Sequence, residues 1–292
     1  MDDPFLMLAT DRLPIDPLAR TRPAVHTLRS RRGGRGVLLR GELERTSLLL
    51  IRYPLQALGG VFALGFSFFV LLYLGRVWDG RLGVFSGNVS ELALSYCLWT
   101  LVSTAVTNVA TQVATDAAAG VLEPLFLVGT PVVRVFEARA VGQAVQGAAI
   151  AVLLAAAFCA GMRWLPSPAV LAAFALALLG TGLSSIGIAA AVSGIALFTK
   201  RMGPVTTPIT FLCMMAMMGS TAQQAAASEG WRLALPFTAD AALVRGAITH
   251  GDIALLPAVL AVAGAVPLWI IGRLVLAHCA WASRRAGSTQ AY

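Results

Sequence analysis

A single carboxylate stands in a short apolar segment near the middle of the chain. The segment GVLEPLFLVGTP runs from Gly120 to Pro131, and Glu123 is its one charged residue. Apolar side chains around a lone acid fit the chemistry of docking. The apolar groups bury in a groove of another protein, and the carboxylate pairs with a basic group at its edge. The pattern predicts a contact surface rather than a catalytic centre.

Two apolar segments carry rows of polar residues at helical spacing. Along 92–114 the row consists of Thr100, Thr104, Thr107, Asn108 and Thr111. Along 205–222 it consists of Thr206, Thr210, Met217 and Thr221. Such rows line a polar path through a membrane protein, or they join neighbouring helices by hydrogen bonds. Methionine fits an adaptable lining and a packed core equally well, so the sequence leaves both interpretations open.

The residue patterns of common enzymes are missing. The only lysine, Lys200 in GIALFTKR, lacks the second glycine and the following hydroxyl residue of a phosphate-binding loop. Neither HExxH nor GxSxG occurs. The four cysteines lie within apolar segments without a CxxC pair, and the three histidines are scattered. We therefore expect no catalytic residue, metal site, disulfide or cofactor in this chain.

Composition places the chain among membrane proteins. Of its 292 residues 58% are hydrophobic and 12% charged, and the mean hydropathy is +0.77. About a quarter of the residues of a soluble globular domain are charged. The net charge of +8 comes from basic residues that separate apolar runs instead of forming a dense patch. This distribution argues against a nucleic-acid partner.

Six segments approach or exceed the roughly 20 apolar residues that cross a bilayer. They are residues 55–74, 92–114, 141–162, 169–198, 205–222 and 253–276. None has an ionisable residue at its centre, although proton- or sodium-driven carriers typically use one. Gly180, Ser184 and Gly187 in the fourth segment predict close packing against another helix. The predicted fold is an all-α integral membrane protein with six transmembrane helices.

The remaining segments flank these spans. Residues 1–36 are polar and rich in arginine, and we expect a flexible basic tail ahead of a transmembrane domain at 37–292. Residues 37–52 alternate apolar and charged groups at helical spacing, which predicts an amphipathic helix on the membrane surface. The segment 225–252 carries too many charges for a span. It is predicted to be a short, partly helical external segment between the fifth and sixth spans.

The distribution of basic residues predicts the orientation. If the amino terminus is cytoplasmic, few of the 22 lysines and arginines lie outside, namely Arg76, Arg81, Arg163, Arg232 and Arg245. Cytoplasmic loops carry the excess of basic residues in membrane proteins. Both termini and the segment GVLEPLFLVGTP are therefore predicted to be cytoplasmic.

This plan resembles the permease subunits of type 2 ABC (ATP-binding cassette) exporters. The resemblance covers about residues 37–282 and includes the surface helix, the six spans and two short motifs. The cytoplasmic motif is Asp116 followed by Gly120, Leu122, Glu123, Leu125 and Pro131, and the external one is Pro236, Thr238 and Arg245. The family usually has Thr and Gln where this chain has Val121 and Pro124.

The resemblance implies a role for each part of the chain. Residues 116–134 would be a coupling segment that docks on a separate ATPase, through Asp116, Gly120, Leu122, Glu123, Leu125, Phe126 and Pro131. Two ATPase subunits would hold ATP and Mg²⁺, and a second permease, identical or homologous, would complete a dimer. The second and fifth spans would line the path of a small or amphipathic solute exported across a bacterial plasma (inner) membrane.

Other interpretations remain open at this stage. The segment 116–134 could be a re-entrant or interfacial helix that only closes the bundle. The whole chain could be a non-transporting membrane scaffold or an ion-gradient-driven secondary carrier. The sequence does not choose the cargo, because proteins of one fold handle many kinds of solute.

Overall fold

The computed structural model describes residues 35–52, 54–82, 88–120, 132–197, 202–218 and 237–286. Within these ranges the secondary structure is helical throughout, with eight helices and no strand. The predicted tail up to residue 34 lies outside the described residues. So do the predicted site residues Leu122, Glu123, Leu125, Phe126, Pro131 and Thr221.

Four helices are long and apolar enough to cross a membrane. They are α3 (Val89–Ala118), α5 (Val132–Gly161), α6 (Pro168–Ala196) and α11 (Leu255–Ala286). They contain the second, third, fourth and sixth predicted spans. Large apolar side chains such as Leu153, Leu179 and Ile271 are exposed on their outer faces. Exposed apolar surface on long apolar helices fits a protein embedded in a membrane.

The first and fifth predicted spans correspond to α2 (Pro54–Leu82) and α7 (Gly203–Met218). Among the described residues, the apolar stretch Gly59–Leu71 of α2 and the whole of α7 are shorter than a span. These two membrane crossings stay predictions. Residues Arg35–Arg52 form α1, a helix where the sequence predicts one. Its position on the membrane surface also stays a prediction.

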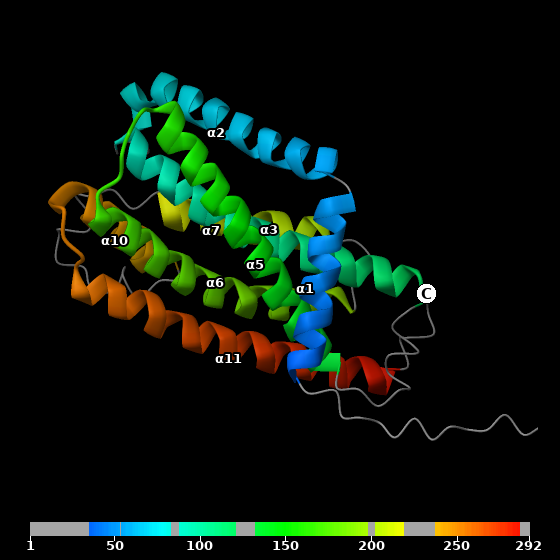
Figure 1. The fold of residues 1–292 in the computed structure, drawn as a ribbon. Coiled ribbons are helices and arrows are strands. Elements are labelled where there is room, and N and C mark those ends of the chain that lie inside the picture. Colours follow the sequence, from blue (N-terminus) through cyan, green and yellow to red (C-terminus); the bar gives the residue numbers. More distant parts are fainter. Residues whose placement is uncertain are drawn as a thin grey trace, which may run out of the picture. The chain divides into compact units, whose positions relative to one another are not determined.

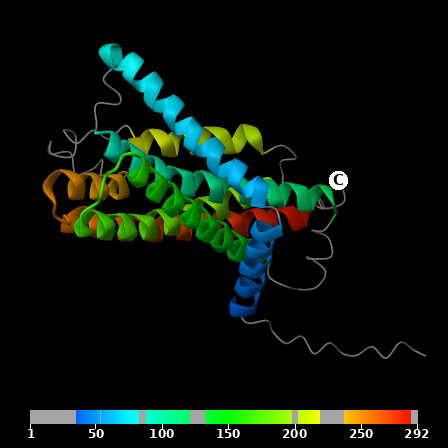
Figure 2. The same cartoon turned by 45° about the horizontal axis from the view of Figure 1, so that its top comes forward.

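Helix α3 is the centre of the packing. It contacts α5, α6 and α7, and its side chains Leu98, Leu101, Val102 and Val106 are fully buried. Helices α6 and α11 run side by side along most of their length, and α1 packs against α5 (Figures 1 and 2). Helix α2 makes fewer contacts, and Phe62 and other side chains on it are exposed.

Small residues explain the close approach of α6 and α11. A Cβ atom on Gly187 of α6 would lie 2.6 Å from the carbonyl carbon of Leu268 on α11, and one on Gly272 would meet the backbone of Gly187. Close backbone contact supplies van der Waals energy where lipid removes the hydrophobic driving force. The predicted packing role of Gly187 is confirmed.

The helix ends follow local sequence signals. Ser167 caps the start of α6, where its Oγ accepts a hydrogen bond from the backbone N–H of Val170 over 3.4 Å, and Pro168 takes the first helical position. Helix α3 ends just before Gly120, whose φ of 69° lies in the left-handed region that favours glycine. Gly120 therefore suits the turn by which the chain leaves α3.

The external segment differs from the prediction in one respect. Its described part contains α10 (Thr238–His250), which packs against α6, α11, α3 and α7. Its charged residues Asp240 and Arg245 are 1% and 5% exposed. Part of this segment is helical as expected, but α10 packs among the helices of the bundle and buries its charged residues. The two charged side chains can be buried because each has a specific contact: Arg245 donates to the end of α7, and Asp240 lies against Gly180 of α6.

Candidate functional site

Three charged residues from three helices meet at one end of the bundle, and we call them the Arg139 cluster. Arg139 on α5 contacts Asp116 on α3, with 2.5 Å between Nη1 and Oδ2. Its Nε also donates a hydrogen bond of 3.4 Å to Oε1 of Glu42 on α1. The Arg139 cluster, which consists of Glu42, Asp116 and Arg139, thus joins α1, α3 and α5.

The cluster is largely shielded from solvent. The side chain of Arg139 is 10% exposed, and those of Asp116 and Glu42 are each 19% exposed. The guanidinium also lies 5.7 Å from the ring centroid of Phe136, one turn earlier on α5. A shielded charge is costly without a partner of opposite sign, which Arg139 supplies to Asp116 and shares with exposed Arg45 at Glu42. The three helices are therefore locked together at this point.

The cluster borders the predicted coupling segment on both sides. The described chain leaves α3 at Gly120 and resumes with α5 at Val132. Asp116 stands before this gap and Arg139 after it, so their ion pair connects the two borders. A second ion pair, 3.1 Å between Nε of Arg273 and Oε1 of Glu137, connects α5 to α11. A force on residues 121–131 would reach four helices through these contacts.

Of the predicted coupling residues, the structure describes Asp116 and Gly120. Asp116 belongs to the Arg139 cluster, and Gly120 ends the helix that carries it. Sequence reasoning missed Glu42 and Arg139 as partners of Asp116. The sequence signal was their charge, which does not say which helix lies opposite.

The polar row of α3 is divided between buried and exposed positions. Thr100 is buried and donates to the carbonyl of Cys97, whereas Thr107 and Thr111 are exposed. Asn108 donates from Nδ2 to Oε1 of Gln143 on α5 over 3.0 Å. At Asn108 the row therefore joins two helices. Thr104 is half-buried, and a role of the exposed residues in a path stays a prediction.

The polar row of α7 faces the bundle. Thr206, Thr210 and Met217 are all buried, and Thr210 donates to the carbonyl of Thr206 within the same helix. The indole Nε1 of Trp99 on α3 donates to the carbonyl oxygen of Thr210 over 2.9 Å. In the single chain this face packs against α3. A path lined by both rows would have to form where α3 and α7 separate or where a second copy adds surface.

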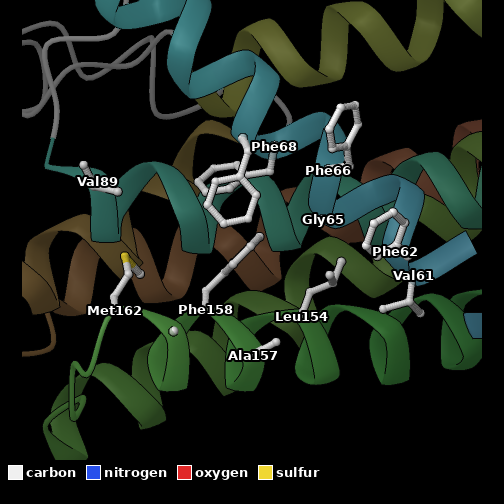
Figure 3. A pocket seen from close by; sticks show the side chains of 12 residues that line it. Val61, Phe62, Gly65, Phe66, Phe68, Val89, Leu154, Ala157, Phe158 and Met162 are labelled. Atoms are coloured by element: carbon white, nitrogen blue, oxygen red, sulfur yellow. The ribbon is translucent and has the colours of Figure 1, made fainter.

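An apolar cavity of about 450 Å³ lies between α2, the start of α3 and the end of α5. Figure 3 shows Leu154 and Phe158 pointing from α5 toward α2. The ring of Phe68 lies 4.5 Å from that of Phe158, between centroids. Other lining residues include Val61, Phe62, Gly65, Phe66, Phe69, Val89, Ala157 and Met162. Because the lining is apolar, the cavity fits the apolar part of a ligand.

A polar contact holds α2 beside this cavity. The hydroxyl of Tyr96 on α3 donates to the carbonyl oxygen of Leu64 over 2.8 Å and lies 2.5 Å from Oγ of Ser67. The ring of Tyr96 also contacts that of Phe68, with 5.0 Å between centroids. This group fixes the wall that α2 contributes to the cavity.

Comparison of the chain with protein-family models, curated proteins and solved structures finds no match. The site must therefore be interpreted from its own geometry.

Buried charged residues on α10 form a second polar region. Arg245 donates from Nη2 to the carbonyl oxygens of Met217 and Met218, over 2.5 and 3.3 Å. These carbonyls are the last two of α7, so Arg245 satisfies a helix end. Burial lowers the pKa of Arg245, and the charge of buried Glu91 on α3 opposes that shift. Arg245 thereby ties α10 to α7 and α3.

Asp240 is the other buried charged residue of α10. It lies against Gly180 of α6, where a side chain would collide with its Oδ1. Burial raises the pKa of Asp240 to about 8, and the neighbouring hydroxyl of Thr181 lowers it by less. Sequence reasoning missed this residue because it assigned the whole segment 225–252 to the outside. A glycine and a threonine in an apolar helix facing an acid are too general a pattern to predict the contact.

Proposed function

We propose that this chain is the transmembrane permease subunit of an ATP-driven exporter. A separate ATPase would dock on residues 116–134 from the cytoplasmic side. ATP binding would draw two ATPase subunits together, move this segment, and turn a cavity between two permease subunits from inward-facing to outward-facing. Such a motion requires that the ATPase contact the two states differently, because a partner that binds both equally shifts neither.

The Arg139 cluster is the observation that carries this proposal. A coupling segment transmits force only if its ends are rigidly attached to the helices that must move. The pair between Asp116 and Arg139 closes the borders of residues 121–131, and Glu42 adds the helix α1. The pair between Glu137 and Arg273 extends the connection to α11. These contacts support a role of the segment as a mechanical handle.

The cavity beside α2 supports an amphipathic cargo. Its apolar lining between α2 and α5 would accept the apolar part of a solute, and any polar part would lie outside this lining. A pocket without polar groups does not orient a wholly polar solute. The proposed cargo class is therefore a molecule with a hydrophobic portion.

Docking is tested by copurification of the chain with its ATPase. Glu123→Arg places a positive charge at the rim of the partner's groove, and Leu125→Asp places a charge within it. Both substitutions should abolish the complex, because an unpaired charge in a buried interface is costly. Leu165→Asp is the matched control, since Leu165 is 92% exposed in the turn before α6 at the other end of the bundle. A complex that survives both substitutions in the segment would disprove docking there.

Coupling is tested separately from docking. Arg139→Gln removes the central member of the Arg139 cluster but leaves residues 121–131 intact. The complex should still form, whereas stimulation of ATP hydrolysis by cargo should be lost. A scaffold would show no cargo stimulation even in the wild-type complex. Unchanged stimulation in Arg139→Gln would overturn the handle function of the cluster.

A second candidate function is favoured by one observation. The buried carboxyl of Asp240 beside the middle of α6 supplies an acid of the kind that ion-driven carriers use. Transport in proteoliposomes separates the two candidates. An exporter requires the ATPase and ATP, whereas a carrier transports with an ion gradient alone.

A further inference from the structure

The carboxyl of Asp240 occupies a notch that glycine alone provides. A Cβ on Gly180 would collide with its Oδ1, and the same Cβ would lie 3.0 Å from the carbonyl oxygen of Ala261 on α11. The carboxyl is thus enclosed between α6 and α11. Asp240 is 1% exposed, so bulk water does not reach it in this state.

The positions of Thr181 along α6 and Ala261 along α11 show how deep in the bundle the notch lies. Thr181 lies about 20 Å along α6 from its start at Pro168, and Ala261 about 9 Å along α11 from Leu255, at 1.5 Å per residue. The notch therefore lies among the apolar helices, below the outer end of the bundle. The polar surroundings that stabilise a carboxylate are sparse at such a depth.

Hydrogen bonding leaves the carboxyl incompletely satisfied. Oδ1 of Asp240 and Oγ1 of Thr181 are both buried, and neither completes a well-aligned hydrogen bond with a described residue. An ionised carboxylate in this place would lack donors, because it can only accept hydrogen bonds. A protonated carboxyl has a donor of its own and requires fewer partners.

No cation among the described residues faces this carboxyl. Helix α10 packs against α3, α6, α7 and α11, and the ionisable groups on these five helices show which charges surround Asp240. Helix α6 has none, and those on the other elements whose side chains the structure describes are Glu91, Tyr96, Cys97, Asp116, Cys213, Arg245, His250, Arg273, His278, Cys279 and Arg285. Arg245 instead contacts the end of α7 and the charge of Glu91. The pKa of Asp240 accordingly reflects burial, which raises it to about 8, and Thr181, which lowers it.

We infer that Asp240 is a proton-binding site, in which the carboxyl over Gly180 stays neutral while α10 packs against α6 and loses its proton when the notch opens to water. On release the O–H bond breaks, the proton passes to water, and the carboxylate keeps the electron pair. The contact between α10 and α6 then depends on proton concentration. The inference is independent of whether ATP or an ion gradient drives transport.

Infrared spectroscopy of the full-length protein in lipid tests the inference directly. The carbonyl stretching band of a protonated carboxylic acid should be present at pH 6, absent from Asp240→Asn, and lost with a midpoint near pH 8. Thr249→Ala is the matched control on α10, because its hydroxyl bonds to carbonyls of the same helix and its removal should leave the band unchanged. A midpoint near the ordinary aspartic-acid value of 3.8 would overturn the site.

One further variant and one labelling experiment keep the test decisive. Thr181→Val removes the hydroxyl that favours the charged form of Asp240, so the midpoint of the infrared titration should move to higher pH.

If Asp240→Asn does not fold, dicyclohexylcarbodiimide, which reacts with protonated carboxyls, can be applied to the wild type. Asp240 should be labelled at pH 7, and the labelling should fall as the pH rises past about 8. Absence of label on Asp240 at pH 7 would contradict the inference.

Discussion

Arg139 and Asp116 form an ion pair, with 2.5 Å between Nη1 and Oδ2, that connects the start of α5 to the end of α3. The residues between these helices include the apolar segment around Glu123. The pair therefore closes the base of the segment that the proposed ATPase would grip. The ion pair makes the attachment of this segment rigid. Without it, the segment could move while α3 and α5 stayed in place.

Removal of Arg139 should destabilise the protein. Arg139→Gln leaves Asp116 shielded without its cation and Glu42 with Arg45 alone, and breaking a buried pair on one side costs roughly 3 kcal/mol. The measurement is unfolding in detergent, followed by tryptophan fluorescence. Arg40→Gln is the control: its ion pair with Glu44 is exposed, with side chains 82% and 61% accessible, so the loss should be below about 0.5 kcal/mol. Equal effects of the two substitutions would refute the structural role of Arg139.

Substitution of Gly187 should separate α6 from α11. In Gly187→Ala the added methyl group collides with the backbone of Leu268, and rigid backbone cannot yield as a flexible side chain does. The melting temperature should fall. Gly182→Ala on the same helix meets nothing within 4 Å and should be neutral or stabilising, by up to about 1 kcal/mol. The opposite order of the two variants would rule out the packing described for α6.

Stability should depend on pH through Asp240. Its pKa is raised from 3.8 to about 8 in the folded protein, so the folded state holds a proton that the unfolded state has lost. The stabilisation relative to Asp240→Asn is complete below pH 4 and disappears as the pH rises to about 8. The loss approaches about 1.4 kcal/mol per pH unit in this window. Parallel pH profiles for wild type and Asp240→Asn would exclude the shift.

Loss of Arg245 should open the end of α7. Arg245→Met removes the donor to the carbonyls of Met217 and Met218 and leaves buried Glu91 without the opposite charge. Hydrogen exchange of the last turn of α7 should speed up, because unsatisfied helix ends fray. Thr249→Ala is the control, since the hydroxyl of Thr249 bonds only to carbonyls of α10. Unchanged exchange in Arg245→Met would show that other contacts hold this end.

Filling the cavity should block an apolar ligand. Leu154→Trp places an indole in the space between α5 and α2, because Leu154 is 2% exposed and lines the cavity. Binding of an apolar fluorescent dye should weaken several-fold. Leu153→Trp adds the same group one residue earlier, on the outer face, where Leu153 is 61% exposed. Similar dye binding by both variants would place the ligand elsewhere.

Membrane character and much of the helical plan are determined by the sequence alone. Long apolar runs bounded by charged residues have one stable solution in a bilayer, a helix that satisfies its own backbone. Four such helices appear where the sequence places them. Gly187 was predictable as a contact for the same reason, since a small residue in an apolar helix exposes backbone to a neighbour.

The pairings between distant charges were decided by the tertiary structure. Periodicity shows which face of a helix is apolar, but it does not say which helix lies opposite. Asp116 therefore looked like part of a docking motif until α1 and α5 brought Glu42 and Arg139 beside it. Asp240 looked like a solvated charge, because burial of an acid depends on a notch that another helix supplies. A side chain's local sequence fixes its chemistry, whereas its solvation depends on the neighbours that folding brings to it.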